Sequence, residues 1–136
     1  MATPLAEDGA VTGGVRAIVQ MEGLAAAAIA IVLYSHSGAS WQLFALLFLV
    51  PDLSMLGYLA GARVGAFAYN LAHSYIGPAA IAAYCLVASD MHVMPFVLIW
   101  VAHIGLDRML GFGLKYADAF GHTHLGRVGG LARERV

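Results

Sequence analysis

The chain has 136 residues, of which 61% are hydrophobic and only 11% are charged, against about 25% charged residues in ordinary soluble domains. A soluble domain of this length must cover its surface with polar side chains, and this sequence has too few of them, so the composition indicates that its surroundings are largely lipid. The net charge of −1 excludes the basic footprint of a nucleic-acid-binding protein, and the single cysteine, Cys85, excludes an intramolecular disulfide and a thiolate zinc site.

Four long apolar segments follow a short leader. Residues 1–14 are small, acidic and glycine-rich, which predicts a flexible N-terminal leader. The apolar segments cover residues 17–34, 41–61, 65–88 and 94–113. As helices, segments of about 18–24 residues are long enough to cross about 30 Å of hydrocarbon. Their length, their richness in alanine and leucine and their lack of period-two alternation argue against strands.

The predicted fold class is therefore all-α: a polytopic membrane protein with a four-transmembrane-helix bundle. Its predicted parts are the leader (1–14), the transmembrane domain (15–113) and a C-terminal tail (114–136). All the lysines and arginines fall on the side of this topology that holds both termini and the middle loop. They are Arg16, Arg63, Arg108, Lys115, Arg127, Arg133 and Arg135. By the positive-inside rule, both termini and the tail are predicted to be cytoplasmic, with the lipid bilayer as the main partner.

Ionisable and polar side chains within the predicted helices mark a candidate site, because placing such groups in a membrane is costly and usually functional. By helical rise they form two layers at matched distances from the cytoplasmic ends of separate helices. The deeper layer, about 11–14 Å in, contains Asp52, His73 and His103. The shallower layer, about 7–9 Å in, contains Glu22, Asn70 and Asp107.

Side-chain spacing also favours a common site. His103 and Asp107 are four residues apart and share one helix face. Pro51 should bend the second helix at Asp52, because proline cannot donate a backbone hydrogen bond. We therefore predict one cavity, open to the cytoplasm, in which the catalytic and metal-binding residues are Asp52, His73, His103 and Asp107. The predicted supporting residues are Glu22, Asn70 and, from the tail, His124.

Four strings of the sequence carry a resemblance to a known family. PDLSMLGY (51–58), YNLAHSY (69–75), AHIGLDR (102–108) and THLG (123–126) resemble domain-of-unknown-function family 4260, a bacterial family of four-helix integral membrane proteins. The resemblance covers about residues 16–127. It implies the four-helix topology and a multi-pass location in the bacterial cytoplasmic (inner) membrane, and it implies no activity.

Two functional interpretations of the cluster stay open. Two imidazoles and two carboxylates suit a divalent zinc, iron or manganese ion, which could activate water against a lipophilic or small substrate. Without a metal, histidines beside carboxylates can relay protons near neutral pH. A relay would suit an isomerase of lipophilic molecules or, in a homo-oligomer, a transporter or channel, because four short helices enclose little space alone.

Two further interpretations are also open. The cluster could be purely structural, although hydrogen bonds between membrane helices contribute only about 0.6 kcal/mol on average, whereas an Asp at the helix centre costs about 2.5–3.5 kcal/mol. Alternatively, His73 and His103 could hold a haem, because their depths match.

Outside the cluster, the sequence predicts simpler roles. Arg108 is expected to extend its guanidinium to the cytoplasmic headgroups. The tail histidines His122 and His124 either fold back over the cavity or stay solvated, and the tail arginines are expected to contact anionic lipid.

Overall fold

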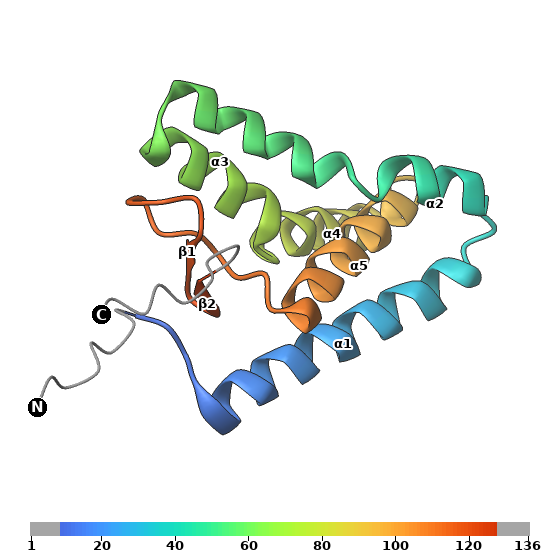
Figure 1. The fold of residues 1–136 in the computed structure, drawn as a ribbon. Helices are drawn as coiled ribbons and strands as arrows, with labels where there is room; N and C mark the ends of the chain where they lie inside the picture. The colour runs from blue at the N-terminus through green and yellow to red at the C-terminus, as the bar shows by residue number, and fades with distance from the viewer. Residues whose placement is uncertain (1–8, 128–136) are drawn as a thin grey trace, which may run out of the picture.

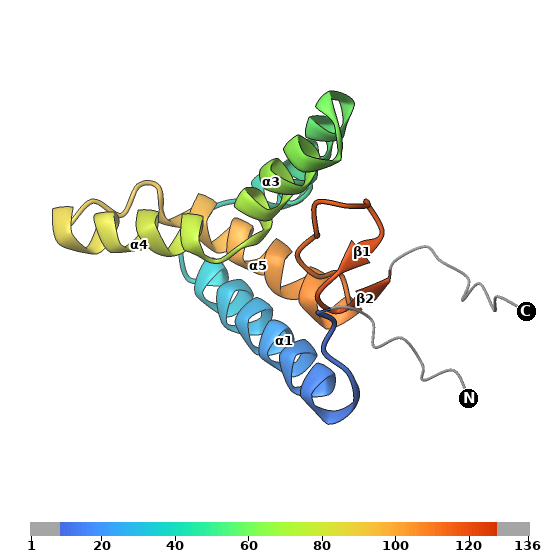
Figure 2. The same ribbon diagram turned by 90° about the vertical axis from the view of Figure 1, so that its left-hand side faces the viewer.

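The computed structural model describes residues 9–127, and this part of the chain is mainly helical. In chain order the elements are α1 (Gly13–Ser35), α2 (Trp41–Leu47), the 3-10 helix η1 (Val50–Ala60), α3 (Ala62–His73), α4 (Ile76–Ala88), α5 (Met94–Leu110), β1 (His122–Thr123) and β2 (Gly126–Arg127). Helix α5 lies in the middle, and Figures 1 and 2 show α1, α4 and the η1–α3 pair extending from it in different directions.

All four predicted segments are helical, but two of them are interrupted. The second segment is divided into α2 and η1, and the third into α3 and α4, which point in different directions (Figure 2). Each interruption begins four residues before a proline: α2 ends at Leu47, before Pro51, and α3 gives way at Ser74, before Pro78. Proline has no N–H for the carbonyl four residues earlier, and its ring clashes with that carbonyl. The bend predicted at Asp52 therefore begins one turn earlier, and the break within the third segment was not predicted.

Two pairs of helices account for most of the packing: α1 with α5, and η1 with α3. The first pair is close because small residues meet at the contact. A Cβ added at Gly105 would lie 2.5 Å from the carbonyl oxygen of Gly23 and 2.7 Å from the backbone nitrogen of Ala27. Small residues of this kind allow helix backbones to approach closely in membranes. Direct packing between the two pairs is sparse.

Three helical stretches are long and apolar enough to cross a membrane: Gly13–Ser35, Trp41–Ala60 and Ala62–Ala88. Their outward side chains are strongly apolar, and Leu59 and Val87 are each 88% exposed. Extensive apolar surface of this kind marks contact with a membrane or with another protein. Helix α5, predicted as the fourth span, has 17 residues and contains more buried residues than any other helix in the described part of the chain. These features suggest a membrane protein.

The described part of the C-terminal tail folds back against α3 and the leader. The side-chain amide of Asn70 donates to the carbonyl of Lys115 and accepts from its N–H, both at 2.7 Å. The N–H of Val11 donates to the carbonyl of His124, so the two ends of the described chain lie together (Figure 1). Residues 1–8 of the predicted leader, and Arg133 and Arg135 of the tail, lie outside the described residues.

Candidate metal centre

Three elements bring four predicted residues to one point. Asp52 follows Pro51 in the first turn of η1, and His73 is the last residue of α3. His103 and Asp107 occupy successive turns of α5, which places them on one face. One ligand atom from each of the four residues lies within 4.8 Å of the other three. The predicted convergence of these residues is therefore confirmed.

The distances from each imidazole nitrogen to the other three donor atoms are short and nearly uniform. The Nε2 atoms of His73 and His103 are 3.1 Å apart. The Oδ1 atom of Asp52 lies 3.2 Å from His73 Nε2 and 3.3 Å from His103 Nε2. The Oδ2 atom of Asp107 lies 3.4 Å and 3.3 Å from the same two nitrogens. Each imidazole nitrogen therefore faces the other imidazole and both carboxylates at almost equal distance.

The five distances that involve a histidine nitrogen are compatible with a four-coordinate metal site. As edges of a regular tetrahedron they would place a common centre about 1.9–2.1 Å from the donors, against Zn–N and Zn–O distances of about 2.0–2.2 Å, and the two carboxylate oxygens lie within 4.8 Å of one another. A network of charge-assisted hydrogen bonds would instead give distances of about 2.7–2.9 Å. The donor atoms are therefore close enough to hold a metal ion, and two of the contacts, His73 Nε2 with Asp52 Oδ1 and with His103 Nε2, also lie within hydrogen-bond distance.

His73 is held with its Nε2 directed at the centre. Its Nδ1 lies 2.9 Å from the carbonyl oxygen of Tyr69, which can only accept, so Nδ1 carries the proton and the neutral ring presents a lone pair at Nε2. The Tyr69 ring stacks on the imidazole at 3.7 Å between centroids, with the planes 8° apart. Metal-binding histidines typically donate their second N–H to a carbonyl in this way.

His103 has a looser environment. The ring of Phe48 packs edge-on against it at 5.2 Å between centroids. The backbone of Phe48 also interacts with the imidazole. Within residues 9–127, however, the buried His103 Nδ1 has no well-aligned hydrogen-bond partner. Because Pro51 has no N–H, it cannot donate to Phe48 in the 3-10 pattern, which leaves the Phe48 carbonyl available on this side.

Arg108 is buried beside the centre, so the prediction that it reaches the headgroups is wrong. Arg108 is only 6% exposed. The guanidinium donates to the carbonyl oxygens of His73, at 2.7 Å, and Phe112, at 3.0 Å. The His73 carbonyl belongs to the last turn of α3, where backbone acceptors have no helical partner. Arg108 therefore joins the end of α3 to α5.

The centre is accessible through its carboxylates. The side chains of Asp52 and Asp107 are 33% and 17% exposed, whereas those of His73 and His103 are 0% and 2% exposed. Both carboxylates line a cavity of about 210 Å³ that the tail covers with Lys115 and Phe120. The Lys115 ammonium donates to the Phe120 carbonyl at 2.7 Å, and burial lowers its pKa. This cavity provides room for water or part of a substrate.

The three predicted supporting residues lie outside the four-residue group. Asn70 binds the backbone of the tail. Glu22 and His124 line a separate cavity of about 300 Å³ beside Arg108. Haem ligation also fits poorly, because the Nε2 atoms of His73 and His103 face one another directly, with no space for a porphyrin between them.

Sequence reasoning missed the residues that surround the donors. Tyr69 lies four residues before His73, and that spacing alone places it on the same helix face. Arg108 adjoins Asp107, but nothing in its position distinguishes a buried arginine from one at a membrane surface. Lys115 and Phe120 reach the cavity because the tail folds back, and the sequence contains no local signal for that path.

The fold and the site together define a class: a helical protein with stretches long and apolar enough to cross a membrane, and a buried group of two histidines and two aspartates close enough to hold a metal ion. The chain belongs to the family described as "Domain of unknown function (DUF4260)", whose model matches residues 16–128. This match confirms the family indicated by the four strings. No curated protein and no solved structure matches the chain.

Proposed function

We propose that this protein is a membrane metalloprotein in which Asp52, His73, His103 and Asp107 bind one divalent zinc, iron or manganese ion. The observation that carries the proposal is the set of donor-atom distances of 3.1–3.4 Å. Mixed nitrogen and oxygen donors suit these metals. Two carboxylates also balance the charge of a divalent cation, which lowers the cost of burying either alone.

The proposed chemistry is metal-assisted hydrolysis of a lipophilic or small substrate. A bound cation of this kind lowers the pKa of a coordinated water and polarises a substrate oxygen. The imidazoles would hold the ion from the buried side. Asp52 and Asp107 line the cavity, where a carboxylate can orient water or accept its proton. Lys115, on the opposite wall, would attract the negative charge that develops on the substrate.

The proposed location is the cytoplasmic membrane of a bacterium, with both termini in the cytoplasm. The bacterial assignment follows from the family resemblance, and the orientation follows from the basic residues, which lie at the termini and the middle loop of the four-segment topology. The contact between the leader and the tail supports the placement of both ends on one side.

Elemental analysis of protein purified in detergent, with an affinity tag that contains no histidine, tests the metal proposal directly. We expect about one metal ion per chain in the wild type, and a loss of at least tenfold in occupancy for His103→Gln and for Asp107→Asn. His92→Gln is the matched control, because the His92 side chain is 95% exposed and lies away from the centre. It should retain the wild-type metal content.

Cobalt substitution provides an independent readout of the geometry. Co²⁺ bound to four nitrogen and oxygen donors in a tetrahedron absorbs visible light far more strongly than octahedral Co²⁺, so the loaded wild type should be intensely coloured and His103→Gln should not. A wild-type protein that binds no zinc, iron, manganese or cobalt after reconstitution would overturn the proposal and leave the proton relay or the structural network.

A further inference from the structure

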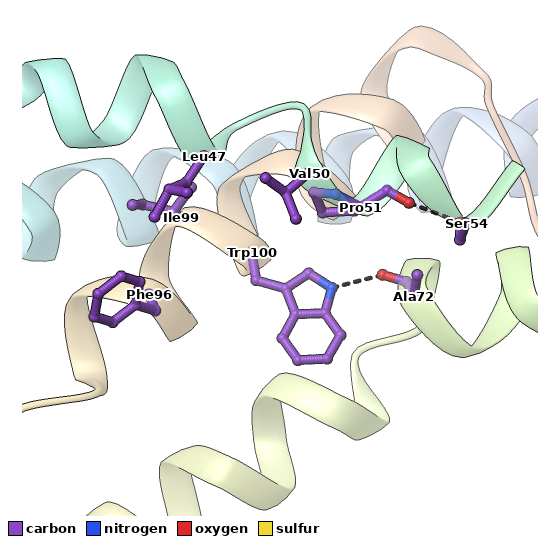
Figure 3. Close-up of a pocket in the computed structure, with 8 residues that line it drawn as sticks. All are labelled: Leu47, Val50, Pro51, Ser54, Ala72, Phe96, Ile99 and Trp100. Atoms are coloured by element: carbon purple, nitrogen blue, oxygen red, sulfur yellow. Dashed lines mark hydrogen bonds between the residues drawn. The ribbon is translucent and has the colours of Figure 1, made fainter. Parts of the chain in front are cut away.

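An apolar groove lies next to the candidate metal centre. It has a volume of about 460 Å³ and is formed by the second predicted segment, the end of α3 and the first turns of α5. Figure 3 shows its main side chains, which are Leu47, Val50, Pro51, Phe96, Ile99 and Trp100. Val50 and Phe96 are each 46% exposed, so the groove opens to the outer surface of the helices.

The polar groups of the groove are already paired with one another. The indole Nε1 of Trp100 donates to the carbonyl of Ala72 at 2.6 Å, and the hydroxyl of Ser54 donates to the carbonyl of Pro51 at 2.7 Å (Figure 3). Both side-chain donors are therefore occupied, and the Ser54 hydroxyl oxygen is the one acceptor left among the groove side chains, so a polar occupant would lose most of its hydrogen bonds with water. The groove therefore favours a hydrocarbon occupant over a peptide or a sugar.

The groove adjoins the centre through three elements. Pro51 immediately precedes Asp52, Ala72 immediately precedes His73, and Ile99 lies one turn before His103. The geometry of η1 separates the groove from the cavity at the tail. In a 3-10 helix, residues three apart lie directly above one another, so Pro51 and Ser54 face the groove while Asp52 and Met55 face the cavity.

We propose that the groove binds one acyl chain of a membrane phospholipid, and that the centre acts on the polar part of the same lipid. The role of the lipid as substrate rests on the proposed metal function, whereas binding of the acyl chain to the groove does not. The occupant is a phospholipid because the groove opens on helices that are long and apolar enough to cross a membrane, where the surrounding hydrocarbon is phospholipid acyl chain. An acyl chain in the groove would place its ester and phosphate beside η1, next to Pro51, with Asp52 between them and the cavity.

Trp100 provides the probe, since the chain contains only two tryptophans and Trp41 lies outside the groove. In a Trp41→Phe background, Trp100 fluorescence is measured in detergent micelles while phosphatidylglycerol brominated in the middle of its acyl chains is added. We expect saturable quenching that unbrominated phosphatidylglycerol reverses. The reciprocal variant, Trp100→Phe, reports on Trp41 and should show only weak quenching that does not saturate.

A groove-filling variant tests the site itself. Ala72→Leu adds bulk to the wall of the groove, and it should weaken the saturable quenching at least tenfold. Ala83→Leu is the matched control, because Ala83 is exposed on α4 and does not line the groove. Ala83→Leu should show the same saturable quenching as the Trp41→Phe protein.

The outcomes separate the two proposals. Quenching that never saturates, or that Ala72→Leu leaves unchanged, would overturn acyl-chain binding. If Trp100 is instead shielded from brominated lipid only in a dimer, the occupant is a second copy of the chain, and the proposal is also wrong. Saturable quenching in a protein without bound metal would keep the lipid site and overturn the metal function alone.

Discussion

Arg108 shows how one buried charge organises the end of a helix. A guanidinium enclosed by protein needs hydrogen-bond acceptors for its donors, because an unpaired buried charge is very costly. Arg108 finds two of them in the carbonyls of His73 and Phe112. The first of these belongs to a candidate metal ligand, so Arg108 fixes the backbone of His73 without touching the donor atoms. It acts as a positioning residue.

His124 makes the docking of the tail sensitive to pH. Burial, followed by the positive charge of Arg108, lowers the pKa of His124 below its ordinary value of 6.5. Its Nδ1 accepts the N–H of Leu114 at 2.8 Å and is therefore unprotonated when the tail is docked. Because the undocked histidine binds a proton more readily, docking is at its strongest above pH 6.5 and weakens as the pH falls below that value.

Amide hydrogen exchange of residues 111–127, measured at about pH 7.5 and about pH 5.5 and corrected for intrinsic rates, checks this prediction. Protection of the tail should fall at the lower pH. His124→Asn is the control, since its side-chain oxygen can accept the same N–H and does not titrate. Equal loss of protection in this variant would assign the pH effect to other groups.

The donors of the centre could be predicted from the sequence because depth in a membrane helix follows from counting residues. Asp52, His73 and His103 were placed at one level in that way, and the structure brings them together. Their partners could not be found by counting. The Lys115–Phe120 wall depends on the path of the tail, and the burial of Arg108 depends on how α3 ends against α5. Both are long-range features with no periodic signal.

The sequence of η1 has a period of three residues, which indicates a 3-10 helix. Leucines recur every third residue at 53, 56 and 59, and these side chains are 62%, 64% and 88% exposed. The residues between them are partly buried. A period of three matches a 3-10 helix, which aligns its side chains in three straight rows. In an α-helix the same leucines would spread over about a third of the circumference instead of forming one straight row.

The break between α3 and α4 also had a sequence signal. Gly77 and Pro78 combine a weak helix former with a residue that removes a hydrogen bond four residues earlier. The apolar composition of the segment hid this signal, because a long apolar run was interpreted as one span. The break has a structural role, since it leaves the His73 carbonyl free for Arg108.

The close contact of α1 and α5 predicts a strong effect of a single methyl group. Gly105→Ala would place its Cβ against the backbone of Gly23 and Ala27, and backbone atoms cannot move aside as flexible side chains can. The two helices must separate, and we expect a loss of about 1–3 kcal/mol in the free energy of unfolding, as for other overpacked cores.

Thermal unfolding in detergent, followed by circular dichroism, measures this loss as a lower Tm. Gly14→Ala is the control, because Gly14 lies in α1 with no atom within 4 Å of an added Cβ. That variant should be as stable as the wild type or slightly more stable, because alanine favours helix. An unchanged Tm for Gly105→Ala would show that α1 and α5 are further apart than described.

At the scale of the whole molecule, the proposed topology of four crossings predicts the side of each loop. Reporter fusions at Ser37 and Met91 should be periplasmic, and fusions after Arg63 and Arg127 should be cytoplasmic, because basic residues are retained on the cytoplasmic side. Alkaline phosphatase and fluorescent-protein activities give opposite readouts at each position. A cytoplasmic signal at Ser37 would contradict the first crossing, and one at Met91 would contradict the crossing by the third segment.

Because the packing between the two helix pairs is sparse, a metal ion at the centre would help to hold the pairs together. Asp52 and His73 come from the η1–α3 pair, whereas His103 and Asp107 come from α5, which packs with α1. A bound ion would therefore be a cross-link between the two helix pairs, and it would restrict the chain in the way that a clip closing a long loop does. Apart from the four donors, the pairs are joined by hydrogen bonds from Arg108 and Trp100 and by the packing of the His73 and His103 rings. Metal occupancy would then change how firmly the two pairs are held together.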